Sequence, residues 1–204
     1  MVVHEDLTGL LAHDLKTPLA AIAMNLDYVL SEMDPNSADA LRSALEDCRQ
    51  ANARAIRIVS DMADVARLAV GDYRPTLCEF CPVGIIERVA NAAAEEAATR
   101  EVRIVWSSTK DPVTAEPELL ARVLDRLVER ALRYARPGSA LAIDHRAQTV
   151  SVHAETATVY RGESPSRALA THFAEAAIQA LGGTLDTETD GKRGLVYRVT
   201  LLTP

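Results

Sequence analysis

The sequence has no excess of positive charge and no long apolar run. Its 22 Lys and Arg residues are outnumbered by 29 Asp and Glu residues, giving a formal net charge of −7 and a pI near 5.3. Such an acidic chain is a poor match for nucleic acid or an anionic membrane surface as its main partner. Because no run of about 18 apolar residues occurs, we expect no membrane-spanning helix. The beginning of the chain also lacks the basic start and apolar core of a signal peptide, so we expect a cytoplasmic protein.

Cysteine is scarce as well, with three residues in the whole sequence, which favours a reducing compartment. Cys78 and Cys81 have Cys-x-x-Cys spacing, but no second pair and no nearby histidine completes a tetrahedral zinc site. The strand-helix context of a thioredoxin-like site is also missing. We therefore interpret both residues as incidental thiols and predict no metal site.

The residues that are present predict a helix around His13. Leucines at 7, 11, 15 and 19 step by four and mark one apolar helix face. His13 lies roughly 200° around the helix from Leu11 and Leu15, so its side chain is expected to face solvent. Asp14 can accept a hydrogen bond from one imidazole nitrogen and leave the other as a nucleophile. Pro18 cannot donate to the carbonyl of Asp14, so a bend is expected one turn later.

Two apolar seams predict a helical hairpin. The first alternates steps of four and three residues from Leu15 to Met33, and the second continues from Leu41 to Ala69. Between them Asp34–Ser37 breaks the helix, with Ser37 in position to cap the next one. Two helices joined by a short turn form an antiparallel hairpin. Since a lone hairpin buries only one stripe, two copies are expected to pair as a four-helix homodimer.

The pattern changes after Gly71–Pro75, where glycine and proline end the hairpin. Helices are predicted over 83–98, 116–134 and 166–181, the last one ended by Gly182 and Gly183; strands are predicted over 102–106, 140–144, 149–153, 184–188 and 195–202. We therefore predict an α+β protein, with a helical hairpin over residues 1–72 and an α/β sandwich over residues 73–204.

The order His13-Asp14-Leu15-Lys16-Thr17-Pro18-Leu19 resembles the H-box in the dimerisation and histidine-phosphotransfer domain of bacterial sensor histidine kinases. The resemblance implies that His13 is the phosphoacceptor and that Asp14 assists its nucleophilicity. It also implies that Thr17 positions the water that dephosphorylates the partner, which in this family is the receiver domain of a response regulator. The alternative is a solvated helix histidine without a role.

The second half resembles the catalytic ATP-binding domain of the same kinases, most clearly over residues 116–134. Pro137–Ser139 and Leu181–Thr184 also fit. The family's N-box asparagines, however, are replaced by Arg126 and Arg130. In the family these asparagines help to hold Mg²⁺ and the phosphates, whereas an arginine is a cation with no acceptor to offer the metal.

Two further nucleotide motifs are missing. The Asp-x-Gly-x-Gly box that recognises adenine should follow the strand at 150–153, where the chain reads Ala154–Thr158 without aspartate or glycine. The glycine-rich phosphate box should open the last helix, where Ser164–Ala170 has no glycine for close backbone approach. We therefore expect a degenerate domain without nucleotide or other cofactor.

Four arginines form a stripe on the predicted helix 116–134: Arg122, Arg126, Arg130 and Arg133. One interpretation is a solvated face with Glu118–Arg122 and Glu129–Arg133 pairs. The other is a docking surface for an acidic partner or a filled nucleotide cleft.

The resemblance favours a histidine phosphotransferase of a phosphorelay, and its alternatives are a response-regulator phosphatase and a non-catalytic pseudokinase scaffold. An active ATP-dependent kinase is disfavoured by the three altered motifs.

Only about a dozen residues precede His13, where sensor kinases usually carry a sensory module. Either a soluble phosphotransfer protein or a fragment of a longer chain is expected.

Overall fold

The computed structural model describes residues 15, 17–25, 27–29, 38–69, 73–156, 165–190 and 194–202. These residues form two compact units. The first comprises the described residues up to Asp64 together with the first residues of α6 (Pro165–Ala180), up to Leu169. The second begins at Val65, inside a helix, and contains the sheet. His13, Asp14 and the predicted helix break at Asp34–Ser37 lie outside the described residues.

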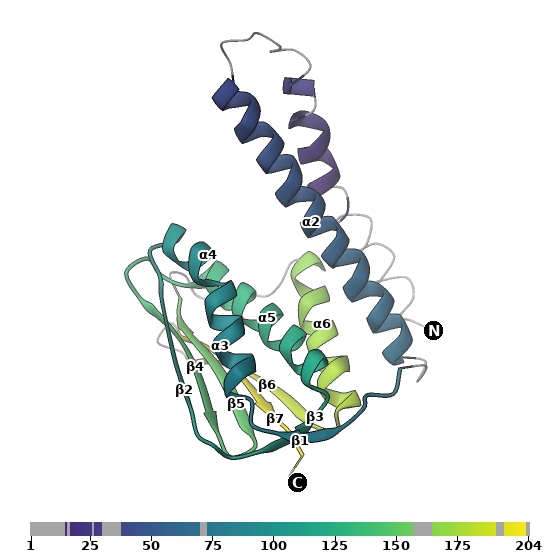
Figure 1. Cartoon of the computed structure of the whole chain (residues 1–204), viewed down its shortest axis with the longest axis vertical. Coiled ribbons are helices and arrows are strands. Elements are labelled where there is room, and N and C mark those ends of the chain that lie inside the picture. Colours follow the sequence, from purple (N-terminus) through teal and green to yellow (C-terminus); the bar gives the residue numbers. More distant parts are fainter. Residues whose placement is uncertain are drawn as a thin grey trace. The chain divides into compact units, whose positions relative to one another are not determined.

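The first unit contains most of the predicted helical hairpin, and the structure confirms that two helices lie side by side there (Figure 1). Residues 17–25 and 27–29 are helical and run beside α2 (Ala38–Ala69). The two helices approach closely where Cys48 Sγ donates to the carbonyl of Ile22 at 3.6 Å. Ala44 and Ala55 on α2 are buried.

The second unit is built on a five-stranded sheet in the order β2-β4-β5-β7-β6. Its strands are β2 (Arg103–Ser108), β4 (Ala140–Arg146), β5 (Thr149–Glu155), β6 (Thr184–Asp190) and β7 (Gly194–Thr200). β2 and β4 are parallel, and the other neighbours are antiparallel. The parallel pair is joined by a crossover that contains a helix, as parallel neighbours require. A separate two-stranded ladder joins β1 (Cys78–Phe80) to β3 (Val113–Ala115).

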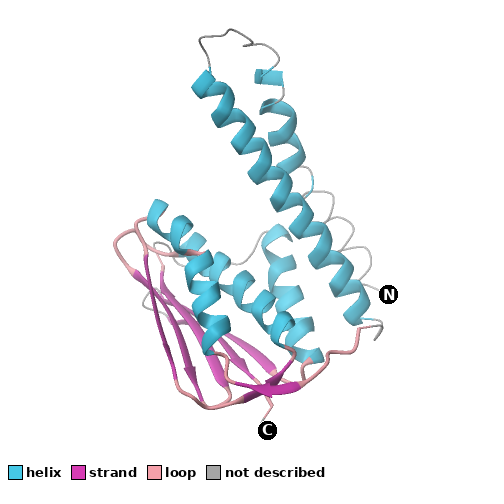
Figure 2. Cartoon of the chain, in the orientation of Figure 1, coloured by secondary structure: helices cyan, strands magenta, loops and turns pink. Residues whose placement is uncertain are grey.

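Helices cover one face of this sheet (Figure 2). They are α3 (Val83–Ala92), α4 (Ala94–Thr99), α5 (Pro117–Tyr134) and α6 (Pro165–Ala180). α5 turns an apolar stripe to the sheet through Leu120, Leu124 and Leu127, spaced four and three residues apart and at most 1% exposed. Along the strands, every second side chain is buried. Ile143 on β4 and Val152 on β5 are examples, and they are paired in register. The predicted α/β sandwich is therefore confirmed.

The structure differs from the sequence prediction in its smallest elements. The helix predicted over 83–98 is divided at Ala93, whose backbone stays in the helical region (φ −88°, ψ −6°). An apolar period cannot detect such a small departure. β1 and β3 have three residues each, too few to establish a period of two. The predicted stop of α6 is confirmed: Gly182 has φ +77°, and Gly183 N donates to the carbonyl of Ile178 at 2.9 Å.

Within the part of the chain that the structure describes, no helix combines the length and apolar character needed to cross a membrane.

Candidate functional site

Of the three predicted H-box residues, the structure describes one. Thr17 is exposed at the beginning of the helical stretch 17–25, and the adjacent Pro18 is buried. His13 and Asp14 lie outside the described residues, so their roles remain predictions.

The other histidines that the structure describes differ sharply from one another. His145 is fully buried; its Nδ1 lies 2.9 Å from Ser108 Oγ, and its Nε2 lies 2.7 Å from the carbonyl of Ala147. Both ring nitrogens are engaged, so this ring is part of the structure and offers no free nucleophile. His153 and His172 are exposed, but neither stands in a sequence motif.

At the position that the resemblance assigns to the second N-box asparagine, the structure has a buried arginine. Arg130 is 5% exposed, and its Nε donates to the hydroxyl of Tyr197 on β7. The guanidinium carbon also lies 5.9 Å from the centroid of the same ring. A guanidinium has five N–H donors and no acceptor, so it cannot ligate Mg²⁺ through a lone pair. The residue at this position therefore does not fit a bound Mg²⁺-nucleotide.

The remaining stripe arginines lie in different surroundings. Arg122 places its guanidinium 4.8 Å from the ring centroid of Phe173 on α6. Arg126 forms a long ion pair with Glu129 at 3.9 Å, and its side chain is only 13% exposed. The interpretation of the stripe as a solvated face is therefore wrong for Arg130 and Arg126. The side of α5 that faces α6 and β7 is instead filled by arginine stems and aromatic rings.

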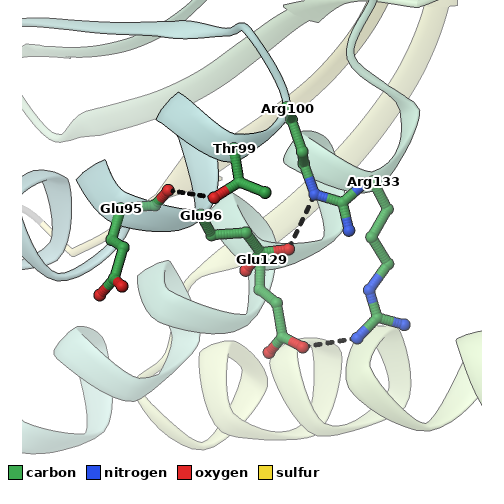
Figure 3. Close-up of polar contacts among 6 residues, drawn as sticks. All are labelled: Glu95, Glu96, Thr99, Arg100, Glu129 and Arg133. Atoms are coloured by element: carbon green, nitrogen blue, oxygen red, sulfur yellow. Dashed lines mark hydrogen bonds and ion pairs between the residues drawn. The ribbon is translucent and has the colours of Figure 1, made fainter. Parts of the chain in front are cut away.

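The predicted Glu129–Arg133 pair is confirmed, at 2.5 Å (Figure 3). The same spacing recurs on α4, where Arg100 Nε donates to Glu96 at 2.9 Å (Figure 3). Pairs of this exposed kind contribute at most a few tenths of a kcal/mol. They stabilise their own helices and do not form a site.

The end of β5, where the adenine box was expected, is tied to the end of α5. Arg136 N donates to the carbonyl of Glu155 at 2.8 Å, and the two side chains form an ion pair. Beside them Ala135 and Thr156 form an isolated antiparallel bridge. Thr156, the first residue after this strand, is thus engaged in backbone pairing. Residues 157–164 lie outside the described part of the chain.

The two cysteines with Cys-x-x-Cys spacing contact different backbone groups. Cys78 Sγ lies 3.7 Å from the carbonyl of Ala115, and Cys81 Sγ lies 3.9 Å from that of Thr109. Both are free thiols. Among the described residues, no group of three His, Cys, Asp or Glu side chains is arranged to hold a metal ion.

Sequence reasoning missed the aromatic partners Tyr197 and Phe173. A signal for Tyr197 was present, because Leu195, Tyr197 and Val199 alternate along β7 and are all fully buried. The pairing itself joins residues 67 positions apart, and no local pattern predicts it.

Comparison with known proteins gives matches over both units. Residues 4–71 match the His Kinase A (phospho-acceptor) domain. The sensor protein IrlS of Burkholderia pseudomallei is 31% identical over 134 residues, which make up 66% of this chain and 28% of the relative. The sensor protein QseC of Salmonella typhi is 28% identical over 183 residues, 86% of this chain and 38% of the relative. The chain thus spans 28% to 38% of the length of these curated relatives.

Solved structures share the fold. A histidine kinase of Acinetobacter baumannii, AdeS, superposes with a TM-score of 0.69 at 17% identity, covering 93% of this chain and 96% of that one. The cytoplasmic segment of the histidine kinase QseC gives a TM-score of 0.58 at 15% identity, covering 74% and 94% of the two chains.

Proposed function

This chain belongs to the sensor histidine kinase family as a transmitter module, and on that premise we propose that it transfers phosphoryl groups through His13 without binding ATP. Membership in this family supports a role in two-component signalling that uses a phosphohistidine. In the proposed reaction an imidazole nitrogen of His13 attacks the phosphorus of a receiver's phospho-aspartate. The N–P bond forms, the acyl O–P bond breaks, and the aspartate carboxylate leaves. The reverse reaction passes the group to another receiver.

The observation that carries the proposal is the burial of Arg130 against Tyr197. The resemblance assigns this position to a metal-binding amide, and a buried cation there repels Mg²⁺ as well as lacking an acceptor for it. The missing adenine and glycine boxes of the sequence support the same conclusion. Each of the three motifs contacts a different part of the nucleotide. The three changes together are therefore stronger evidence against ATP binding than a change in one motif.

Family membership fits an ATP-dependent kinase at least as well, which makes direct measurement decisive. Titration calorimetry of the full chain with Mg²⁺-ATP is expected to give no heat of binding. A dissociation constant in the micromolar range would contradict the proposal and favour an autokinase.

A second candidate, a response-regulator phosphatase, is favoured by the exposure of Thr17. A hydroxyl one turn after the phosphoacceptor can orient water on the receiver's phospho-aspartate. In that case the phosphoryl group passes to water and never resides on His13. A scaffold that binds the receiver would perform neither reaction.

The proposed partners are the receiver domain of a response regulator and a second copy of this chain, in the cytoplasm. Large apolar side chains on both helices of the hairpin are exposed in the single chain: Leu19, Met24, Tyr28, Leu45, Ile56 and Val59. Such a set on one small unit exceeds the scattered apolar exposure of a monomer, which supports pairing into a four-helix bundle. Light scattering at micromolar concentration is expected to give twice the chain mass of 22.1 kDa. A mass of one chain would refute the dimer.

One labelling experiment separates the candidate functions. The chain is mixed with radiolabelled ATP and, separately, with a receiver carrying labelled phospho-aspartate. The expected result is label on the wild-type chain from the receiver alone, lost in His13→Ala and retained in the matched control His153→Ala, an exposed histidine outside the motif. Faster loss of receiver label with none on the chain would favour the phosphatase, and no change would favour the scaffold. Label from ATP would identify a kinase.

A further inference from the structure

The segment that leaves α2 is held by the carboxylate of Glu116. The hydroxyl of Tyr73 donates to one carboxylate oxygen, and Thr76 N donates to the other at 2.7 Å. Both donors precede β1, whereas Glu116 lies between β3 and α5. One side chain therefore joins parts of the chain that are 40 to 43 positions apart.

This carboxylate extends the ladder between β1 and β3. Cys78 lies opposite Ala115 at the end of that antiparallel pair, so the next step outward would set Leu77 opposite Glu116. At that point the backbone of Glu116 turns into α5. The carboxylate of Glu116 therefore accepts the hydrogen bond from the amide of Thr76 in place of a backbone carbonyl.

Glu116 is also the N-cap residue of α5, yet its side chain makes no capping hydrogen bond. Pro117 follows at the first helical position, where it has no N–H that needs a partner. A negative charge beside a helix N-terminus is favourable in itself. The hydrogen-bonding capacity of the carboxylate is therefore left for Tyr73 and Thr76.

The last turn of α2 packs against the hydrophobic core of the second unit. Val65 is 8% exposed and belongs to the hydrophobic core of the second unit, and Leu68 packs against that core. The guanidinium of Arg67 lies 5.3 Å from the ring centroid of Tyr73. In addition, Tyr73 N donates to the carbonyl of Arg67 at 3.3 Å. An unbroken series of contacts thus leads from α2 through Tyr73 to Glu116.

We propose that Glu116 is a positioning residue that couples the last turn of α2 to the beginning of α5 through Tyr73 and Thr76. A displacement of the end of α2 is passed along these contacts to α5, the helix that holds Arg130 against Tyr197. All of the contacts lie within the second unit. The coupling therefore stands or falls independently of the proposed phosphotransfer function.

Amide hydrogen exchange of the full chain, read residue by residue by NMR, tests this coupling. In Glu116→Ala the amide of Thr76 is expected to exchange at least about tenfold faster, because it loses its acceptor. The amide of Leu68 is expected to exchange about threefold faster, because the last turn of α2 loses its tie to α5. The amide of Val152 in the central strand β5 reports global opening and is expected to stay within about twofold of wild type.

Two further variants sharpen the test. Glu116→Gln keeps a side-chain oxygen that accepts from Thr76 N, so it is expected to restore most of the protection. Glu118→Ala is the matched control: this residue lies two positions later, is 76% exposed at its side chain and pairs with Arg88 at 3.5 Å. It is expected to leave the exchange of Thr76 and Leu68 unchanged.

The coupling is wrong if Glu116→Ala leaves Thr76 or Leu68 within twofold of wild type. It is equally wrong if Glu118→Ala accelerates both amides as much, or if Glu116→Gln restores no protection. Acceleration of Val152 to the same extent as Thr76 would indicate a general loss of stability and would also overturn the proposal.

Discussion

Arg130 on α5 and Tyr197 on β7 form a buried pair, in which the guanidinium Nε donates to the phenol oxygen and lies against the ring. Arg130 is 5% exposed and Tyr197 is fully buried. Taking a guanidinium out of water is costly unless its donors are satisfied. The pair therefore fixes α5 to the sheet at the place where the resemblance assigns an amide to Mg²⁺.

Arg130→Ala is expected to lower the free energy of unfolding by about 2 kcal/mol, because it leaves the buried Tyr197 hydroxyl without this donor and opens space beneath α5. Urea unfolding at neutral pH measures the change. Arg133→Ala is the control: its side chain is 34% exposed in an i,i+4 pair with Glu129, and a change below about 0.5 kcal/mol is expected. Equal effects of the two substitutions would show that the burial of Arg130 does not matter.

Gly183→Ala is expected to destabilise the second unit by more than about 2 kcal/mol. A Cβ at this position would lie 2.3 Å from the carbonyl oxygen of Thr200, which is backbone of the adjacent strand and cannot swing aside. Gly84→Ala provides the contrast, since nothing lies within 4 Å of its Cβ position. Gly84 lies in α3, so alanine there is expected to raise stability by up to about 1 kcal/mol. Thermal unfolding of both variants gives the two signs directly.

Glu46 on α2 is expected to titrate at unusually low pH. Hydrogen bonds, chiefly from Arg49 and then from Gln50, lower the pKa of its carboxyl from 4.5 to about 2. Since the folded-state pKa is the lower one, these contacts stabilise the fold fully above pH 4.5, and the contribution is lost as the pH falls through about 2. An NMR titration of the carboxyl carbon measures the midpoint. Arg49→Ala is expected to move it back towards 4.5, whereas Arg42→Ala, one turn earlier, should not.

Thr17→Ala is expected to spare phosphoryl acceptance by His13 and to slow dephosphorylation of the receiver, because the hydroxyl is assigned to placing water. Both rates come from the same labelled receiver. The melting temperature should change little, since Thr17 is exposed and alanine is the better helix former by a few tenths of a kcal/mol. Unchanged dephosphorylation, or acceptance lost together with it, would remove this role from Thr17.

Much of the fold could be predicted from periodicity. The apolar stripe of α5 and the alternation along β4, β5 and β7 reflect burial on one face, and a period in the sequence reports such burial directly. The three-residue strands β1 and β3 were missed because they are shorter than any period. The division between α3 and α4 was missed because Ala93 departs too little from helical geometry.

The sequence alone determined the features that depend on order along the chain. These are the order of residues from His13 to Leu19 that resembles an H-box, the arginines at 126 and 130, and the glycine stop at 182 and 183. Each is a local matter of which groups a short segment presents.

What only the tertiary structure decided is which of those groups are withdrawn from water. Arg130 and Arg133 lie three positions apart on one helix, yet only Arg130 is buried. The reason is that Tyr197, which is 67 positions away in the sequence, packs against Arg130 from β7. Glu116 was predicted as the first residue of a helix, and its carboxylate instead holds Tyr73 and Thr76. Partners so distant in sequence leave no local pattern. The packing of the sheet against α5 pairs Arg130 with Tyr197, and the β1–β3 ladder brings Glu116 to Thr76.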